Sequence, residues 1–135
     1  MALTLTEKTQ LCAEAADSKK AEGIVVLDVQ PFSSVADQFL ICSGASDRQV
    51  RAIADAIEEQ LTQNGEKPLA VEGYQKGTWV LIDCADLIIH VFDDEMRRFY
   101  DLERLWYRAA RLEVPGVAAA VSEPPGSAAL LVEEG

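Results

Sequence analysis

The sequence predicts a single α/β (α+β) domain in which helices flank a mixed sheet of about five strands. Three observations predict this class. Amphipathic helical patterns alternate along the chain with short β-branched runs. The chain has 135 residues, which is the size of one ordinary domain. Hydrophobic residues make up 49% of it, which is enough to form one core.

The first helix and the first two strands are predicted from capping residues and apolar runs. Thr4 and Glu7 have the spacing of a capping box, so a helix is expected to follow Thr4. Gly23 is a natural residue to end this helix. The nearly continuous β-branched run at 24–29 predicts a strand covered on both faces, and 38–42 predicts a second strand.

The second helix is the clearest element of the sequence. Ser46 precedes Gln49 by three residues, which again fits a capping box. Apolar residues then recur at the spacing of one helix face, and they are Val50, Ile53, Ala54, Ile57 and Leu61. Asn64 and Gly65 predict the end of the helix.

Three short strands with tight connections are predicted next, at 69–72, 78–83 and 87–92. Side chains alternate along a strand, so every second residue of the middle strand lies on the same face. One of these faces combines a large aromatic side chain, a leucine and a carboxylate. Its residues are Trp79, Leu81 and Asp83.

Asp93 and Asp94 can cap a last helix. Its apolar residues are Met96, Phe99, Tyr100 and Trp106. The composition changes after Arg111, because 112–135 contains three of the five prolines and no basic residue. We therefore expect a folded domain over 1–111 and a flexible, acidic, Pro/Ala-rich tail over 112–135.

The charge of the chain excludes some partners and favours others. Twelve basic residues stand against 23 acidic ones, which gives a net charge of -11. This is the wrong sign for binding phosphates, so we expect no direct contact with nucleic acid. An acidic surface suits a basic protein partner, although solubility alone also explains the acidity. We expect no membrane span and no secretion signal, and hence a cytoplasmic protein.

The three cysteines, Cys12, Cys42 and Cys84, are odd in number and lie far apart among apolar neighbours. We expect them to be reduced core residues, with a redox or metal-binding role as the less favoured alternative.

No catalytic residue, cofactor site or metal site is predicted. The loop at 43–49 leads into a helix N-terminus, which can hold phosphate, but it has one glycine and no Lys-Ser/Thr ending, so a helix cap is favoured. Asp83, Asp86 and His90 could be imagined as metal ligands, yet alternation places His90 beside apolar residues, as a packed core histidine. The alternative function is a nucleotidyltransferase-like nucleotide-binding enzyme that uses this loop with Asp83 and Asp86.

Aromatic residues near acids and arginines in the C-terminal half favour an interaction surface, since aromatics bury a large area and keep a polar tip. Core packing explains Trp79 and Phe99 equally well. An interface is favoured for the mixed polar and aromatic end of the fold, which comprises Tyr100, Asp101, Glu103 and Trp106.

Four stretches together closely resemble the Iojap-like ribosomal silencing factors. They are KKAEGIVVLDV (19–29), DQFLICSGASDRQVRAIADAIEEQL (37–61), KPLAVEGYQKGTWVLIDCADLIIHVF (67–92) and RRFYDLERLW (97–106). The resemblance covers the chain from about Leu11 to Trp106. The proline-rich part from Leu112 onward has no clear counterpart in the family.

The resemblance implies a nucleotidyltransferase-like fold without catalytic residues, often a homodimer when free. Such a protein binds the large ribosomal subunit through ribosomal protein fourteen, blocks association with the small subunit and represses translation under nutrient limitation or in stationary phase. The implied contact surface combines the exposed sheet face with the C-terminal end of the fold. Its residues are Trp79, Leu81, Asp83, Tyr100, Asp101, Leu102, Glu103 and Trp106.

Overall fold

The computed structural model describes residues 3–117. Its helices are α1 (Leu5–Ser18), α2 (Asp47–Gln63), α3 (Asp94–Tyr100) and α4 (Leu102–Leu105). Its strands are β1 (Glu22–Asp28), β2 (Gln38–Gly44), β3 (Ala70–Glu72), β4 (Trp79–Asp83), β5 (Leu87–Asp93) and β6 (Ala110–Leu112). Over this range the strands form one sheet of six, in the order β3-β4-β5-β2-β1-β6. The predicted fold class is confirmed, with one strand more than expected.

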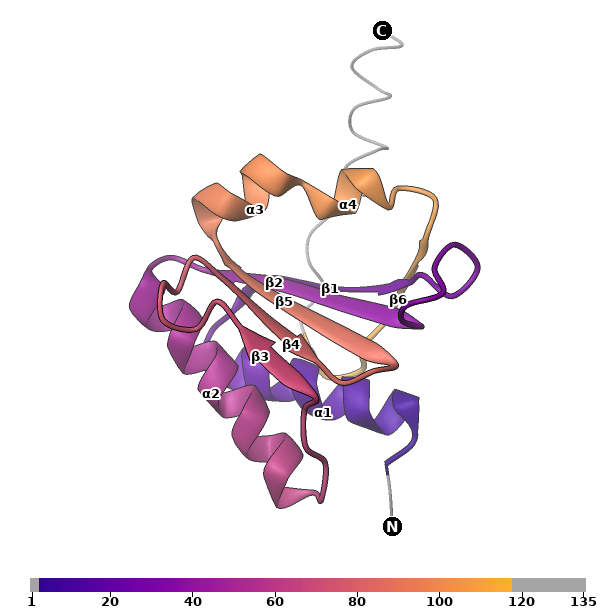
Figure 1. Ribbon diagram of the computed structural model, residues 1–135, viewed down its shortest axis with the longest axis horizontal. Helices are drawn as coiled ribbons and strands as arrows, with labels where there is room; N and C mark the ends of the chain where they lie inside the picture. Colours follow the sequence, from indigo (N-terminus) through magenta and orange to yellow (C-terminus); the bar gives the residue numbers. More distant parts are fainter. Residues whose placement is uncertain (1–2, 118–135) are drawn as a thin grey trace, which may run out of the picture.

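The sheet is mixed, and its pairing sets which strand ends lie together. β2 and β5 are parallel, with Gln38 opposite Leu87 and Gly44 opposite Asp93. The other neighbouring strands are antiparallel. Helices α1 and α2 cover one face of the sheet, and the short helices α3 and α4 lie over the other (Figure 1).

The main core lies between the sheet and helices α1 and α2. The predicted apolar face of α2 is fully buried there, from Val50 to Leu61. The predicted N-caps at Thr4 and Ser46 are present, because Thr4 accepts from the Glu7 amide and Ser46 accepts from the Gln49 amide. The capping box is complete at Thr4, whose amide donates to Glu7 Oε1, but not at Ser46, because Gln49 Oε1 accepts from the Ala45 amide. Burying each large apolar side chain contributes roughly 1.5–3 kcal/mol, so this core stabilises the fold more than the caps do. Cys12 and Cys42 are buried as expected, whereas Cys84 is only half-buried.

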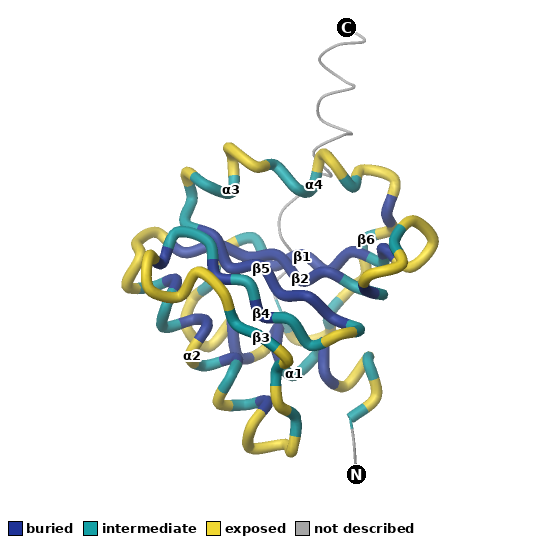
Figure 2. The backbone as a smooth tube through the Cα atoms, in the orientation of Figure 1, coloured by how far each residue is buried: buried dark blue, intermediate teal, exposed yellow. Residues whose placement is uncertain are grey.

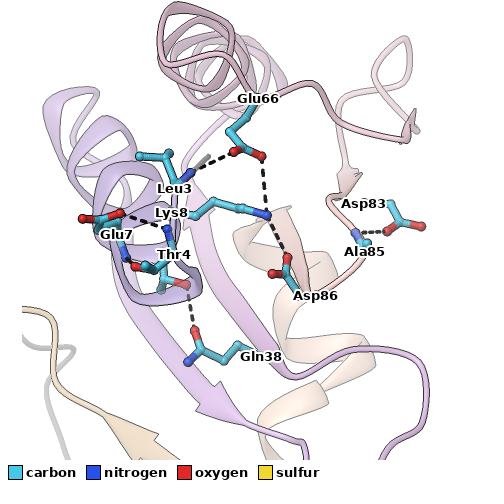
Figure 3. A network of polar contacts seen from close by, with 10 residues as sticks. Leu3, Thr4, Glu7, Lys8, Gln38, Glu66, Asp83, Ala85 and Asp86 are labelled. Atoms are coloured by element: carbon cyan, nitrogen blue, oxygen red, sulfur yellow. Dashed lines mark hydrogen bonds and ion pairs between the residues drawn. The ribbon is translucent and has the colours of Figure 1, made fainter. Parts of the chain in front are cut away.

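Lys8 fixes the start of α1 against one end of the sheet (Figure 3). Its ammonium group donates to Asp86 Oδ1 at 2.8 Å, in the turn before β5, and lies 3.6 Å from Glu66 Oε1, after α2. Thr9 donates to Gln38 Oε1 at 2.7 Å, at the start of β2. These bonds orient α1 across the beginnings of β2 and β5. Since Lys8 is buried, removing Asp86 would leave its charge poorly solvated, with Glu66 at 3.6 Å as the remaining acid.

A second, smaller core lies on the opposite face of the sheet, beneath α3 and α4. Strand β5 is almost wholly buried between the two cores, whereas α3 and α4 contain half-buried and exposed residues only (Figure 2). The single last helix expected from the sequence is wrong in detail. Asp101 has a left-handed backbone with φ of 47°, which interrupts the helical hydrogen-bond ladder and separates α3 from α4. Aspartate is one of the few residues that tolerates this conformation.

The chain then returns to the sheet as β6, which pairs antiparallel with β1. β6 crosses the boundary expected after Arg111, and Val114 and Val117 pack against the main core. Ordered packing therefore extends past the expected end of the domain. Residues 118–135, most of the predicted tail, lie outside the described residues. Within the described part, no helix is long and apolar enough to cross a membrane.

Candidate docking surface

Strand alternation places three of the predicted contact residues on the sheet face that α3 and α4 overlie. Trp79, Leu81 and Asp83 are each half-buried, and the two residues between them are fully buried in the main core. The sequence interpretation expected an exposed sheet face. The structure shows instead that α3 and α4 partly cover it. Leu81 and Trp79 pack against the second core together with Leu102 and Trp106, so four predicted residues meet there.

Six aromatic rings connect this core to the surface, and we call them the aromatic cluster. They are Phe39, Trp79, His90, Phe92, Tyr100 and Trp106.

The Trp79 ring lies 4.5 Å from that of Tyr100 and 5.0 Å from that of Phe92, measured between centroids. Phe92 is fully buried whereas Tyr100 is 45% exposed. The cluster thus presents partly exposed rings on a rigid buried base.

His90 holds the Trp79 indole in place. The indole Nε1–H donates to His90 Nδ1 at 3.1 Å. Burial lowers the pKa of His90 to about 4, so the imidazole is neutral near pH 7 and its Nδ1 can accept this bond. The ring proton must then sit on Nε2, a buried atom with no hydrogen-bond partner among the residues described. His90 is the packed histidine that the sequence predicts, with a second task that the sequence does not reveal.

The predicted acidic contact residues occupy different environments. Asp83 Oδ1 accepts from the Ala85 amide at 2.8 Å and so stabilises the turn between β4 and β5. Asp83 lies four residues along β4 from Trp79, which is about 13 Å at strand spacing. Asp101 forms the junction of α3 and α4. The Glu103 side chain is only 12% exposed and pairs with Arg97 and Arg111, so its carboxylate is already occupied within the chain.

Sequence reasoning missed some residues that shape this surface. Arg97 pairs with Glu103 six residues later, which is not a helical pairing distance, so no pattern in the sequence links the two. Phe99, for which core packing was as good an interpretation as an interface, is 73% exposed. Leu105 and Tyr107 are also exposed. The sequence offered one signal for this exposure, because Phe99 and Leu105 each directly follow an arginine in a short helical segment.

The residues of the alternative nucleotide-binding site, which are the 43–49 loop, Asp83 and Asp86, do not lie together. The loop at 43–49 follows β2, whereas Asp86 precedes β5. Because β2 and β5 are parallel, the loop and Asp86 lie at opposite ends of seven-residue strands, roughly 20 Å apart. Gln49 also fills the loop, since its Oε1 accepts from the Ala45 amide at 2.7 Å. Across residues 3–117, no group of three or more His, Cys, Asp or Glu residues could hold a metal ion.

The chain is similar in sequence to known proteins of one family. Residues 2–130 match the family described as "Ribosomal silencing factor during starvation". The ribosomal silencing factor RsfS of Bacillus subtilis is 46% identical over 97 residues, which are 72% of this chain and 82% of that protein. RsfS of Halalkalibacterium halodurans is 43% identical over 111 residues, 82% and 95% of the two chains.

The fold agrees with a solved structure as well. A crystal structure of a protein from Chromobacterium violaceum superposes with a TM-score of 0.76 at 30% sequence identity, covering 90% of this chain and 98% of that one. The match extends along both chains and is not limited to one motif. The chain belongs to the ribosomal silencing factor family.

Proposed function

We propose that this chain docks on the large ribosomal subunit through ribosomal protein fourteen, blocks association with the small subunit and so represses translation when nutrients are limiting. The name of the family and the names of its relatives support a silencing role. The observation that carries the proposal is the aromatic cluster. Trp79 and Tyr100 are partly exposed, their rings are in contact at a tilt of 48°, and buried residues lie behind them. Preordered aromatic residues of this kind dominate the energetics of protein interfaces.

The charges on this part of the molecule would set orientation more than affinity. A ribosomal protein presents a basic surface, and Asp83 and Asp101 can pair with its lysines and arginines at the rim of the contact. The net charge of -11 favours a protein surface over ribosomal RNA as the direct contact. We place this activity in the cytoplasm.

We propose that the silencing is steric and needs no catalysis. The separation of the 43–49 loop from Asp83 and Asp86 supports this view, because nucleotidyl transfer requires its phosphate-binding and metal-binding groups side by side. A bound protein of this size would occupy space at the subunit interface.

We also propose that the free protein is a homodimer formed through α3, α4 and the loop to β6. Residues 93–112 contain five acidic residues and five arginines, a net charge of zero in a chain of -11. Elsewhere two copies would bring like charges together, whereas this segment is self-complementary. Phe99, Leu105 and Tyr107 add exposed apolar area there. Leu105→Asp should then shift the mass measured by light scattering from dimer towards monomer, and an unchanged mass would contradict this interface.

Co-sedimentation with isolated large subunits tests the proposed docking. Wild-type protein should pellet with the subunits, and Trp79→Ala should weaken binding by about 30-fold, since truncating a central aromatic costs about 2 kcal/mol. Tyr74→Ala is the matched control, because Tyr74 is an exposed aromatic bonded to Asp55 of α2, outside the aromatic cluster. Failure of the wild-type protein to pellet at low salt, or equal binding of Trp79→Ala, would rule out this docking mode.

A further inference from the structure

We propose that Arg97 and Glu103 are positioning residues of the docking surface. Their ion pair would fasten α3 and α4 to the sheet and so order the surface that meets the partner, without either side chain touching that partner. This inference rests on the proposed function only for the identity of the partner. It changes the role expected for Glu103, which the family resemblance made a contact residue.

Arg97 uses all of its hydrogen-bond donors inside the chain. Its Nη1 donates to the Glu22 carbonyl at 3.1 Å and to Ser43 Oγ at 3.2 Å. Its Nη2 donates to the Gly23 carbonyl at 2.7 Å and to Glu103 Oε2 at 3.0 Å, and its Nε donates to Glu103 Oε1 at 3.1 Å. A guanidinium carries five N–H groups, and five acceptors are present. One side chain thus joins α3 to β1, β2 and α4.

Glu103 is the second residue of the ion pair, and we call the Arg97–Glu103 pair with its bonds to β1 and β2 the clamp. Its two oxygens accept a bidentate pair from Arg97, the strongest geometry for such a contact. Arg111 of β6 approaches the same carboxylate at 3.7 Å. The side chains of Arg97 and Glu103 are 15% and 12% exposed, so solvent screens this pair less than a surface pair. The charge of Glu103 is therefore already paired with two arginines of its own chain, and little of its carboxylate is exposed to a basic partner.

Apart from this ion pair, α3 and α4 are held mainly by apolar and aromatic side chains that remain partly exposed. Helices of seven and four residues are too short to be stable alone, and neither contains a buried residue. Met96, Leu102 and Trp106 reach the second core, but each remains partly exposed. The junction at Asp101 is in a left-handed conformation. The Arg97–Glu103 pair thus supplies polar contacts that the apolar packing alone does not replace.

Gly23 offers a way to disturb the clamp without changing either charged residue. It adopts φ of +57°, and a Cβ added there would lie 2.7 Å from Arg97 Nη1. The guanidinium would have to move away from the Glu22 and Gly23 carbonyls. Gly65 is a matched control, because its φ is +79° and nothing lies within 4 Å of an added Cβ. The two substitutions share the backbone strain and differ in the contact with Arg97.

The test compares local order with binding in the full-length chain. Variants Arg97→Met, Glu103→Gln and Gly23→Ala are examined beside Arg48→Met and Gly65→Ala. Arg48 is an exposed arginine of α2, outside the segment 93–112, and has no ion pair among the described residues. Hydrogen exchange is followed in the segment 94–106 and in β5, and affinity for isolated large subunits is measured by co-sedimentation.

The clamp predicts that Arg97→Met and Gly23→Ala speed amide exchange in 94–106 at least tenfold while β5 stays protected, and that subunit affinity falls at least tenfold. Arg97→Lys should recover part of both, because lysine keeps the charge but not the bidentate geometry. In the exchange of 94–106 and in subunit affinity, the two controls should match wild type within about twofold.

Two results would overturn the proposal. If amide exchange in the segment 94–106 is the same in Arg97→Met as in wild type, the ion pair does not order that segment. Lost affinity with unchanged exchange would make Arg97 a contact residue. If wild-type protein fails to bind large subunits, the proposed function fails while the exchange measurement still decides the clamp. If Arg97→Met does not fold, Gly23→Ala and Glu103→Gln provide the same comparison.

Discussion

Gly73→Ala should destabilise the protein far more than the same change at another glycine of similar backbone conformation. Gly73 follows β3 with φ of +83°, and a Cβ there would overlap the carbonyl oxygen of Trp79. That oxygen belongs to backbone, which cannot rotate away as a side chain can. The hairpin between β3 and β4 would have to open at the residue that anchors the aromatic cluster. Gly65 has φ of +79° and open space around it.

The comparison separates two costs. A left-handed conformation costs alanine roughly 1–2 kcal/mol, and the stiffer unfolded chain returns about 0.4–1 kcal/mol, so Gly65→Ala should lose about 1 kcal/mol. Gly73→Ala carries the same net cost plus about 1–3 kcal/mol for displacing packed groups. Its total loss should therefore be about 3 kcal/mol. At roughly 4 °C per kcal/mol, the Tm values should fall by about 4 °C and about 12 °C.

Urea unfolding followed by circular dichroism measures both free energies of unfolding, and tryptophan fluorescence reports on Trp79 in the same samples. The slope of the free energy against urea should stay the same in all three proteins, so that only the midpoint moves. Equal losses for the two variants would refute the reasoning, because they would mean that the backbone contact at Gly73 costs nothing.

Three further predictions follow from single groups. His90 is neutral in the fold with a pKa of about 4 against 6.5 when unfolded, so stability should fall as pH drops below about 6.5. Between about pH 7.5 and about pH 5, His90 should account for a loss of about 2 kcal/mol in the free energy of unfolding, measured in urea titrations. The pH dependence of His90→Gln should be smaller by this amount. Burial raises the pKa of the Cys84 thiol to about 11, that of Cys42 to about 12 and that of Cys12 as well. A disulfide reagent should therefore label the native protein slowly, half-buried Cys84 first, and all three thiols rapidly in urea; fast native labelling would contradict these environments. Ser46→Ala removes the cap that accepts from the Gln49 amide and should cost about 1 kcal/mol of stability, whereas an unchanged urea midpoint would show that the cap contributes nothing.

The elements with strong local patterns could be predicted from the sequence. The capping box at Thr4 predicts a helix start, and the apolar spacing of α2 predicts a helix with one buried face. The structure contains both. Strand alternation also placed Trp79 and Leu81 on one face correctly. These features depend on residues fewer than about five positions apart, so tertiary contacts did not override them.

Features that depend on distant residues could not be predicted in this way. β6 is three residues long, and only its pairing with β1 makes it a strand. The break at Asp101 depends on how the chain crosses the sheet, and Arg97 meets the Gly23 carbonyl 74 residues away. The same holds for Glu103, whose sequence context suggests a surface acid although its side chain faces two arginines. A local pattern contains no information on such long-range contacts.

Association of the two ribosomal subunits, followed by light scattering, tests the central claim most directly. Isolated large subunits would be incubated with the protein before small subunits are added. Wild-type protein should lower the extent of association in proportion to the fraction of large subunits that carry it, and Trp79→Ala should restore association at the same protein concentration. Full association in the presence of wild-type protein that remains bound to the large subunits would contradict the proposed steric silencing.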